Sequence, residues 1–547
     1  MRLIDLLLGE TRTSLRRLGM MAAVAGISNA ALLAIVNRAA GHIKDGQPQL
    51  TSVVLFLIFI LAYIYSQRYV LLTTSAEIER LVHSYRERLI NRLKMCELRE
   101  VEHIGRGRIF SSISSDTRII SQTANALVMG AQSALLIVFA CVYLATISMT
   151  SLVLSSIFLA IAISIYQGKM QGISDTLRDA AEEENKLHDL VNGLLDGFKE
   201  VKLSSQRAAA VLEDVLSVSD RTAVFRTVAL QAMGVMFIFA QVSFLLLLGT
   251  LVFLTPMFGS NYSGSVMESM TTVIFLIGPI SGLVGTVPQI AVANSAAENL
   301  YNLEQLLEVS THERNRASTA PTPADMPATM KTLELRHVFF SHVTKDSQFD
   351  VGPIDLTIRS GETIFITGGN GSGKSTLIKL LTGLYWPVSG ELLVNDVPVT
   401  AENAQLFRDR FCAVFSDFHL FRKLYGISMP DAEVANAWLA EMEITGKTEI
   451  VGDGFSTVDL SAGQRKRLAL VSALLEDKPI VVLDEWAADQ DPHFRRKFYD
   501  ELLPRMKASG KTIIAVTHDD RYFHIADRHL HMEEGKLRDL TENLANG

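Results

Sequence analysis

The chain has 547 residues, which exceeds the size of a single hydrophobic core and predicts two or three domains. Its formal net charge is −8, and this acidic balance argues against nucleic acid as a partner. The three cysteines, Cys96, Cys141 and Cys412, lie far apart and match no metal-ligand spacing. Neither a disulfide framework nor a zinc site is therefore expected.

The first part of the chain is rich in apolar stretches. Residues 1–17 contain scattered charges and no small-residue cleavage site, which indicates a retained segment rather than a signal peptide. Six segments of about 20 residues, the length of a membrane-crossing helix, then follow near residues 18–40, 52–72, 124–146, 151–167, 227–254 and 266–292. None carries Lys, Arg or Asp at its centre, where such a charge costs about 3 kcal/mol. The sequence thus predicts an all-α six-helix transmembrane domain over residues 1–309.

Basic residues concentrate before the first span and between spans two and three and spans four and five. These residues are Arg12, Arg16, Arg17, Arg80, Arg86, Arg88, Arg92, Lys94, Arg99, Arg106, Arg108, Lys169, Arg178, Lys186, Lys199 and Lys202. Because Lys and Arg mark the cytosolic side, we expect both chain ends to lie in the cytosol. The two basic connections, of roughly 50 and 60 residues, are too long to be structureless. We expect them to be helices that turn near residues 102–116 and 192–202.

The composition changes after the last span. Residues 310–330 are polar and contain Pro321, Pro323 and Pro327, which is typical of an extended linker. Beyond the linker, short apolar runs alternate with helical stretches, with strands expected over residues 363–367, 480–483 and 512–516. This alternation predicts an α/β domain over residues 331–547, with a mostly parallel sheet covered by helices.

A glycine-rich run follows the first of these strands. The sequence from Gly368 to Ser375 fits the P-loop pattern, in which glycines let backbone N–H groups turn inward around a triphosphate. The lysine adds a positive charge at the outer phosphates, and the hydroxyl of Ser375 is expected to ligate Mg²⁺. The predicted nucleotide-binding residues here are Gly368, Gly369, Asn370, Gly371, Ser372, Gly373, Lys374, Ser375 and Thr376.

A pair of carboxylates ends the second predicted strand. Asp484 follows four apolar residues and is the expected second partner of Mg²⁺, and Glu485 is the candidate that orients or deprotonates the attacking water. An isolated Asp-Glu pair is ordinarily a solvated strand end. Together with the P-loop, the pair predicts hydrolysis of a nucleoside triphosphate with Mg²⁺.

A third motif, from Asp459 to Arg465, lies between the first two. Ser-x-Gly-Gln is by itself a common pattern at a helix N-terminus. In this order, the motif resembles the signature of the ATP-binding cassette family, with Ala462 in place of the first glycine. The resemblance implies that Ser461, Gly463 and Gln464 contact the γ-phosphate bound to a second copy of the chain. A homodimer would then enclose two ATP molecules.

Further positions follow the same family order. The resemblance implies three catalytic residues, namely Lys374, Glu485 and the switch histidine His518. His342 stands where the family has an aromatic residue that stacks on adenine, and Phe340 is an alternative for that role.

One position departs from the family pattern. Ser416 stands where the family places a glutamine that reaches Mg²⁺. Serine is shorter, so the expected link to the metal runs through water or through Asp417. The interval from Ser416 to the signature is short, which indicates a compact helical subdomain.

The order of a membrane half and one cassette resembles half of an ABC type I exporter, which implies a homodimer in membrane lipid. Trp486-Ala487, Ser416 and the chain length resemble the exporters of cyclic peptides and siderophore precursors, of the pyoverdine, syringomycin and microcin J25 types. The implied cargo is a cyclic peptide, a lipopeptide or a siderophore precursor. The alternatives are a lipid or multidrug exporter and, from another class, an ATP-gated channel or sensor subunit.

Residues of spans five and six are candidates to line a cargo cavity, namely Met233, Met236, Phe237, Phe239, Gln241, Met270, Phe275 and Ser281. The plainer interpretation is that Met and Phe fill helix contacts and that the glutamine bonds across helices. Pro279 and Pro288 are expected to bend span six or to serve as its hinge.

Overall fold

The computed structural model describes residues 12–42, 50–253, 263–317, 326–343, 348–427 and 432–541. The chain separates into two compact units. One is a helical unit made of Met1–Lys94 and Arg106–Leu306, and the other is an α/β unit made of Met95–Gly105 and Leu307–Gly547.

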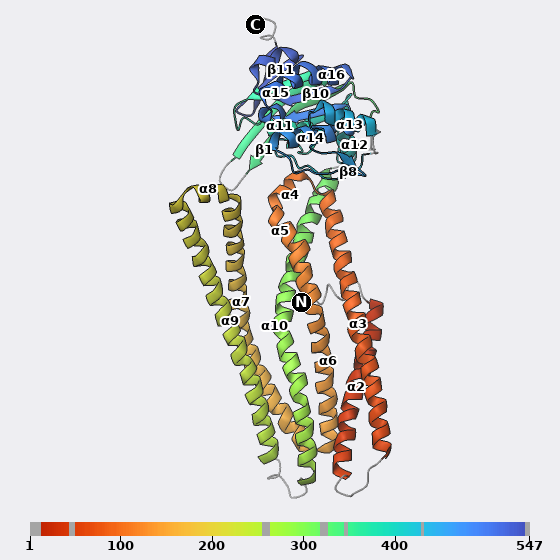
Figure 1. Cartoon of the computed structure of the whole chain (residues 1–547). Helices are drawn as coiled ribbons and strands as arrows, with labels where there is room; N and C mark the ends of the chain where they lie inside the picture. The colour runs from red at the N-terminus through yellow and green to blue at the C-terminus, as the bar shows by residue number, and fades with distance from the viewer. Residues whose placement is uncertain are drawn as a thin grey trace. The chain divides into compact units, whose positions relative to one another are not determined.

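Long helices and short connecting ones make up the helical unit (Figure 1). They are α2 (Arg12–His42), α3 (Leu50–Met95), α5 (Arg106–Ser111), α6 (Thr117–Ile147), α7 (Met149–Asp196), α8 (Phe198–Leu203), α9 (Ser205–Phe253) and α10 (Ser263–Ala317), with a π-helical turn, η2, at Ser112–Asp116. Within the described residues, six helices are long and apolar enough to cross a membrane. The predicted spans fall in α2, α3, α6, α7, α9 and α10, apart from residue 254, which lies outside the described residues.

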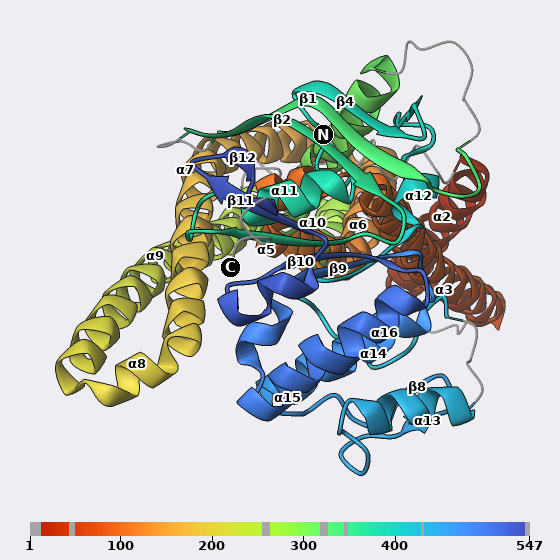
Figure 2. The same ribbon diagram turned by 90° about the horizontal axis from the view of Figure 1, so that it is seen from above.

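The predicted helical extensions are continuous with the apolar segments. Helices α7 and α9 run side by side and are joined through α8 (Figures 1 and 2). Ion pairs fasten them together, with Glu183 bound to Arg221 at 3.1 Å and Glu184 bound to Arg226 at 2.7 Å. The break at Gly197 lies where a turn was expected. Near the apolar ends, α6, α9 and α10 share a core that includes Leu144.

The α/β unit contains a six-stranded sheet in the order β12-β11-β3-β10-β9-β6, in which all but β12 are parallel. These strands are β3 (Thr363–Gly368), β6 (Phe411–Val414), β9 (Ile480–Asp484), β10 (Thr512–Val516), β11 (Arg528–Glu533) and β12 (Lys536–Asp539). Strands β3, β9 and β10 are buried along their whole length. Because both faces are buried, the sequences of these strands contain continuous apolar runs and do not alternate between apolar and polar residues.

A second, antiparallel sheet has the order β2-β1-β4-β5, with β1 at Thr332–Val343, β2 at Gln348–Arg359, β4 at Ser389–Val394 and β5 at Val397–Pro398. The short strands β7 (Ile450–Val451) and β8 (Gly454–Phe455) form a hairpin. The helices are α4 (Leu98–Ile104), α11 (Lys374–Leu381), α12 (Ala404–Arg408), α13 (Ala432–Glu441), α14 (Ala462–Leu475), α15 (Pro492–Lys497) and α16 (Leu503–Ala508), with short turns η5 (Trp486–Asp489), η6 (Phe498–Leu502) and η7 (Asp520–Ile525).

The core of this unit lies on both faces of the six-stranded sheet. Ile364 and Ile366 of β3 pack in a cluster with α11 and the antiparallel sheet, whereas Phe365 packs in a cluster with α14, α15 and η6. Alternating side chains along one strand thus reach opposite faces, as the pleat requires. Figure 2 shows α14, α15 and α16 grouped on one side of the strands.

The expectation of an extended linker over residues 310–330 is wrong in its first part. Helix α10 continues to Ala317, and the strand β1 begins at Thr332. The residues up to Ala317 include good helix formers, and the first proline of the segment comes only at Pro321. Residues 318–325 lie outside the described part of the chain.

Candidate active site

The glycine-rich loop joins the carboxyl end of β3 to the start of α11. Gly368 has φ +146°, and a Cβ atom there would lie 2.2 Å from the carbonyl oxygen of Met532, so only glycine fits. Lys374 begins α11 with its side chain buried. Its Nζ donates to the carbonyls of Gly368 and Gly369, both at 2.9 Å. The ammonium is therefore held against the loop that the sequence predicts to hold phosphates.

Asp484 ends the neighbouring strand β9 and is only 3% exposed. Its Oδ2 accepts a hydrogen bond from Ser416 Oγ at 3.1 Å and from Ser375 Oγ at 3.5 Å. Its Oδ1 has no hydrogen-bond partner within the described residues. Burial raises the pKa of Asp484, and the hydrogen bonds from Ser416 oppose that rise. A buried carboxylate with a free oxygen beside hydroxyl groups has the oxygen ligands that Mg²⁺ prefers.

Glu485 occupies an uncommon backbone conformation, with φ 51° and ψ 35°. Its N–H donates to the carbonyl of Val516, the last residue of β10, at 3.1 Å. Its Oε1 lies 3.3 Å from His518 Nε2 and 4.0 Å from Lys374 Nζ. The structure therefore brings the three predicted catalytic residues together at one carboxylate.

The signature residues lie at the N-terminus of α14. Ser461 caps the helix, and its N–H donates to Gln464 Oε1 at 3.3 Å in a capping box. The carbonyl of Gly463 accepts a hydrogen bond from Gln490 Nε2 at 3.2 Å. In the described part of the chain, these residues contact each other and the turn after Glu485 rather than the glycine loop of the same chain.

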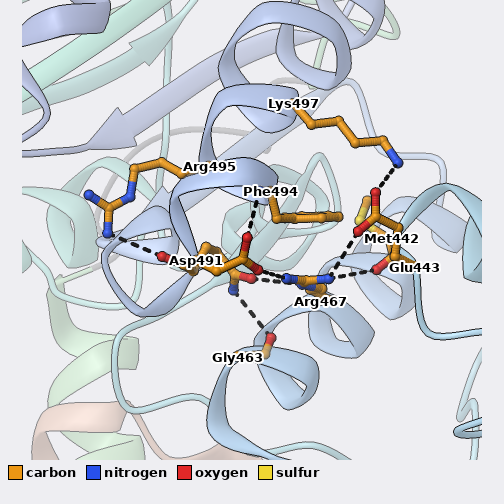
Figure 3. A network of polar contacts seen from close by, with 9 residues as sticks. Met442, Glu443, Gly463, Arg467, Asp491, Phe494, Arg495 and Lys497 are labelled. Carbon is orange, nitrogen blue, oxygen red and sulfur yellow. Dashed lines mark hydrogen bonds and ion pairs between the residues drawn. The ribbon is translucent and has the colours of Figure 1, made fainter.

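Figure 3 shows how Arg467, one turn further along α14, is held. Its guanidinium donates to Asp491 at 2.6 Å and stacks on the ring of Phe494 at 3.6 Å. It also donates to Gln490 Oε1 at 2.8 Å. On its other side it lies 3.7 Å from a carboxylate oxygen of Glu443. This network ties α14 to the residues that follow β9.

The adenine-stacking alternative at Phe340 is wrong. Phe340 is fully buried and stacks on Tyr385 with ring centroids 5.0 Å apart, because β1 directs it into the core. His342 is exposed at the end of β1, opposite Phe349 of β2. Phe349 is half-buried and lines a cavity together with Gly369 to Ser372. Phe349 therefore places an aromatic ring beside the loop, as does Phe523, which lines a second cavity with Gly368 to Asn370, and the sequence analysis missed both.

The segment Met95–Gly105 is part of the α/β unit and contacts the helix that follows the glycine loop. Glu102 accepts hydrogen bonds from Tyr385 at 2.6 Å and from Lys379 of α11 at 3.0 Å. The guanidinium of Arg99 lies over the ring of Phe340 at 5.2 Å. Hydrogen bonds from Tyr385 and Lys379 outweigh burial and lower the pKa of Glu102. The segment is thus attached directly to α11.

Comparison with known proteins agrees with this geometry. Residues 351–488 match the family described as ABC transporter. Over 469 residues, the chain is 34% identical to the ATP-binding protein SyrD of Pseudomonas syringae pv. syringae, a match that covers 83% of this chain and 82% of that protein. This chain belongs to the ABC transporter family. In this ABC transporter, ATP hydrolysis drives transport across a membrane.

The fold is that of an exporter. A bacterial Atm1-family ABC exporter solved with ATP bound superimposes with a TM-score of 0.79 over 98% of this chain and 97% of that chain, at 17% sequence identity. This likeness confirms the predicted order of a six-helix membrane part and an α/β nucleotide-binding domain. The transporter is also 26% identical over 286 residues to an ATP-dependent lipid A-core flippase of Burkholderia thailandensis, covering 50% of this chain and 46% of that protein. It is 27% identical over 249 residues to the ABC multidrug transporter MDR2 of Trichophyton rubrum, covering 43% of this chain and 18% of that protein.

Proposed function

We propose that this transporter is a homodimeric half-transporter that exports a peptide-like cargo, namely a cyclic peptide, a lipopeptide or a siderophore precursor. The observation that carries the hydrolytic part is the convergence of Lys374 and His518 on the carboxylate of Glu485. The peptide-like cargo is supported by the family resemblance around Trp486, and the likeness to the ATP-binding protein SyrD over most of the chain supports the use of ATP.

In this proposal, the N–H groups of residues 368–376 and the ammonium of Lys374 bind the phosphates of ATP. Ser375 and Asp484 would hold Mg²⁺, and the fit to that role is that Asp484 Oδ1 has no partner within the described residues while its Oδ2 accepts from the hydroxyls of Ser375 and Ser416. The ion, when bound, neutralises charge that develops on the phosphates. Glu485 accepts a proton from the attacking water, and His518 holds the carboxylate in place.

The proposed dimer explains the position of the signature residues. Within the described residues, the polar contacts of Ser461, Gly463 and Gln464 are with one another and with Gln490. In this proposal, a second copy supplies them to each nucleotide. ATP would then favour a closed dimer that faces outward. Reversing a 1:99 preference to 99:1 requires about 5.5 kcal/mol of differential binding. Hydrolysis and loss of the γ-phosphate remove that difference.

The membrane part supports a cargo with an apolar portion. Helices α7, α9 and α10 line an open cavity of about 600 Å³, whose walls are mainly aliphatic and aromatic residues that include Phe158, Phe239 and Phe244. Of the candidate cargo residues from the sequence, Phe239 lines this cavity. The hydroxyls of Tyr166 and Ser243 are its polar groups. A lipid or multidrug cargo is the alternative, favoured by the likeness to the flippase and to MDR2.

We place the protein in the bacterial inner membrane, with the ATPase part and both chain ends in the cytosol. The basic residues that support this orientation, such as Arg80 and Lys186, lie on the extended parts of α3 and α7. Domain boundaries near residues 309 and 331 are part of the same proposal. Single cysteines introduced at Ser121 and at Ser219 would react with a membrane-impermeant reagent from the cytosolic side only, and labelling from the outside would contradict the orientation.

The test of function is transport by the purified protein in sealed proteoliposomes. A cyclic lipopeptide is expected to stimulate ATP hydrolysis and to accumulate against its gradient, whereas Glu485→Gln binds ATP without turnover or accumulation. Stimulation by lipid and not by peptide would support the flippase alternative. Flux that only follows the gradient would support an ATP-gated channel or sensor. Wild-type hydrolysis by Glu485→Gln would reject Glu485 as the base.

A further inference from the structure

A lysine outside the phosphate-binding loop holds the backbone of Glu485. Lys466 lies on α14, and its side chain is only 8% exposed. Its Nζ donates to the carbonyl oxygen of Glu485 at 3.0 Å and pairs with the carboxylate of Asp489 at 2.6 Å. A single ammonium therefore contacts both ends of the turn that follows the strand β9.

A second contact runs in the opposite direction. The indole N–H of Trp486 donates to the backbone carbonyl of Lys466 at 2.8 Å. Trp486 is 1% exposed, and its ring packs against Phe498 with centroids 4.5 Å apart. Because the indole is buried among aromatic rings, the residue after Glu485 cannot move without displacing α14.

The next residue of the helix extends this attachment. Arg467 donates to Gln490 and to Asp491, and Gln490 in turn donates to the carbonyl of Gly463 (Figure 3). The segment from Glu485 to Asp491 is therefore attached to the first two turns of α14, the first of which carries the signature residues. The left-handed backbone of Glu485 is a conformation that persists only when its surroundings impose it.

We propose that Lys466 is a positioning residue that links the signature end of α14 to the hydrolytic carboxylate of the same chain. This inference rests on the proposed function, in which Ser461 contacts the ATP bound by the partner and Glu485 acts on the ATP of its own chain. Lys466 joins these two groups through one helix and one turn. Docking of Ser461 at one nucleotide thus sets the position of Glu485 at the other nucleotide.

The first test compares Lys466→Met with a matched control in the reconstituted full-length dimer. Lys511→Met is the control, because Lys511 is 13% exposed and also binds one carboxylate, of Asp477, and one backbone carbonyl, of Lys478, both at 2.9 Å. Lys466→Met is expected to lower kcat by about tenfold or more, because it removes a charge-assisted hydrogen bond to Glu485. The KM for ATP is expected to stay unchanged. Lys511→Met keeps the wild-type kcat. A wild-type kcat for Lys466→Met would overturn the inference.

The second test uses mixed dimers in which Ser461→Arg disables one of the two sites. When Lys466→Met and Ser461→Arg are on the same chain, the surviving site uses the Glu485 that has lost its lysine. When they are on different chains, the surviving site uses a Glu485 with Lys466 intact. Both arrangements place Ser461→Arg on the chain that supplies the acting Glu485, so their comparison isolates Lys466, and single-turnover hydrolysis is expected to be slower in the same-chain arrangement. Equal rates, or a slow rate only in the other arrangement, would show that Lys466 merely supports the signature.

A third variant covers the case in which Lys466→Met does not assemble. Asp489 is 55% exposed, so Asp489→Asn leaves the fold intact while it removes the charge that orients Lys466. It is expected to lower kcat by a smaller factor, again with KM unchanged. If Glu485→Gln is inactive while Asp489→Asn and both mixed dimers hydrolyse normally, this inference fails and the proposed function stands. Normal turnover by Glu485→Gln would instead remove the proposed function.

Discussion

Replacing Ser416 with alanine tests whether this serine, which stands in place of the family glutamine, prepares Asp484 for a metal ion. The Ser416 hydroxyl donates to Asp484 Oδ2 at 3.1 Å, and the acceptor is only 3% exposed. Burial raises the pKa of Asp484, whereas this hydrogen bond favours the ionised form. Ser416→Ala therefore shifts Asp484 further toward its protonated form.

The structure sets the size of the effect. A hydrogen bond to a charged group contributes about 1.5–3 kcal/mol, and the lower value applies because Ser416 is exposed and water can replace its hydroxyl. A difference of about 1.4 kcal/mol changes the ratio of ionised to protonated carboxyl about tenfold. The pKa of Asp484 is higher in the variant, so on acidification its carboxylate becomes protonated at a higher pH than in the wild type. Protons therefore compete with Mg²⁺ more strongly in the variant.

The assay is a titration of ATP hydrolysis with Mg²⁺ at acidic and at alkaline pH. At acidic pH, Ser416→Ala is expected to need about tenfold more Mg²⁺ than the wild type. At alkaline pH, both proteins need the same concentration, because Asp484 is ionised in each. Thr541→Val is the control, since it removes a hydroxyl that donates to the carboxylate of Asp539 on β12. A Mg²⁺ requirement that changes equally at every pH would refute the reasoning.

Three other predictions follow from contacts of the α/β unit. Phe349→Ala is expected to raise KM for ATP by about tenfold, because one base-stacking ring is lost, whereas His342→Ala raises it less. Equal effects of the two substitutions in steady-state kinetics would contradict the placement of Phe349 at the nucleotide. Tyr385→Phe removes a hydrogen bond to Glu102 and is expected to lower the ratio of cargo-stimulated to basal ATP hydrolysis, with basal hydrolysis retained. Asp484→Asn removes a carboxyl whose pKa burial raises, so the Mg²⁺-free variant should melt at a higher temperature than the wild type at alkaline pH, where the buried charge destabilises the wild type. An unchanged or lower melting temperature would show that burial of the charge is not destabilising.

The membrane helices and the central strands could be predicted because each has a signal within its own residues. Segments of about 20 apolar residues indicate spans, and uninterrupted apolar runs such as Ile480–Leu483 indicate strands buried on both faces. The end of α10 could not be predicted from composition. Polar residues before Pro321 are compatible with a linker and with an exposed helix, and the structure has a helix to Ala317.

In the candidate site too, some residues could be predicted from the sequence and others could not. The glycine loop and Asp484–Glu485 were identifiable because their chemistry requires particular residue types at fixed spacing, and the structure brings them together. Lys466 and Phe349 gave no such signal. Lysine on a helix is ordinarily solvated, and its burial here depends on contacts with the turn after β9, which is distant in the sequence. Phe349 reaches the glycine loop only because β2 pairs with β1 in one particular register.

Two of the residues in which this chain departs from the family pattern lie beside the carboxylates that end β9. The phosphate-binding loop keeps the family residues, whereas Ser416 and Trp486 both lie where Asp484 or Glu485 is held. Helix α14 is buried at consecutive positions from Lys466 to Val471, so it cannot rotate independently of the turn that it contacts. A displacement at its signature end must therefore reach Glu485. Differences between this transporter and other family members should accordingly include the rate of hydrolysis and its coupling to transport.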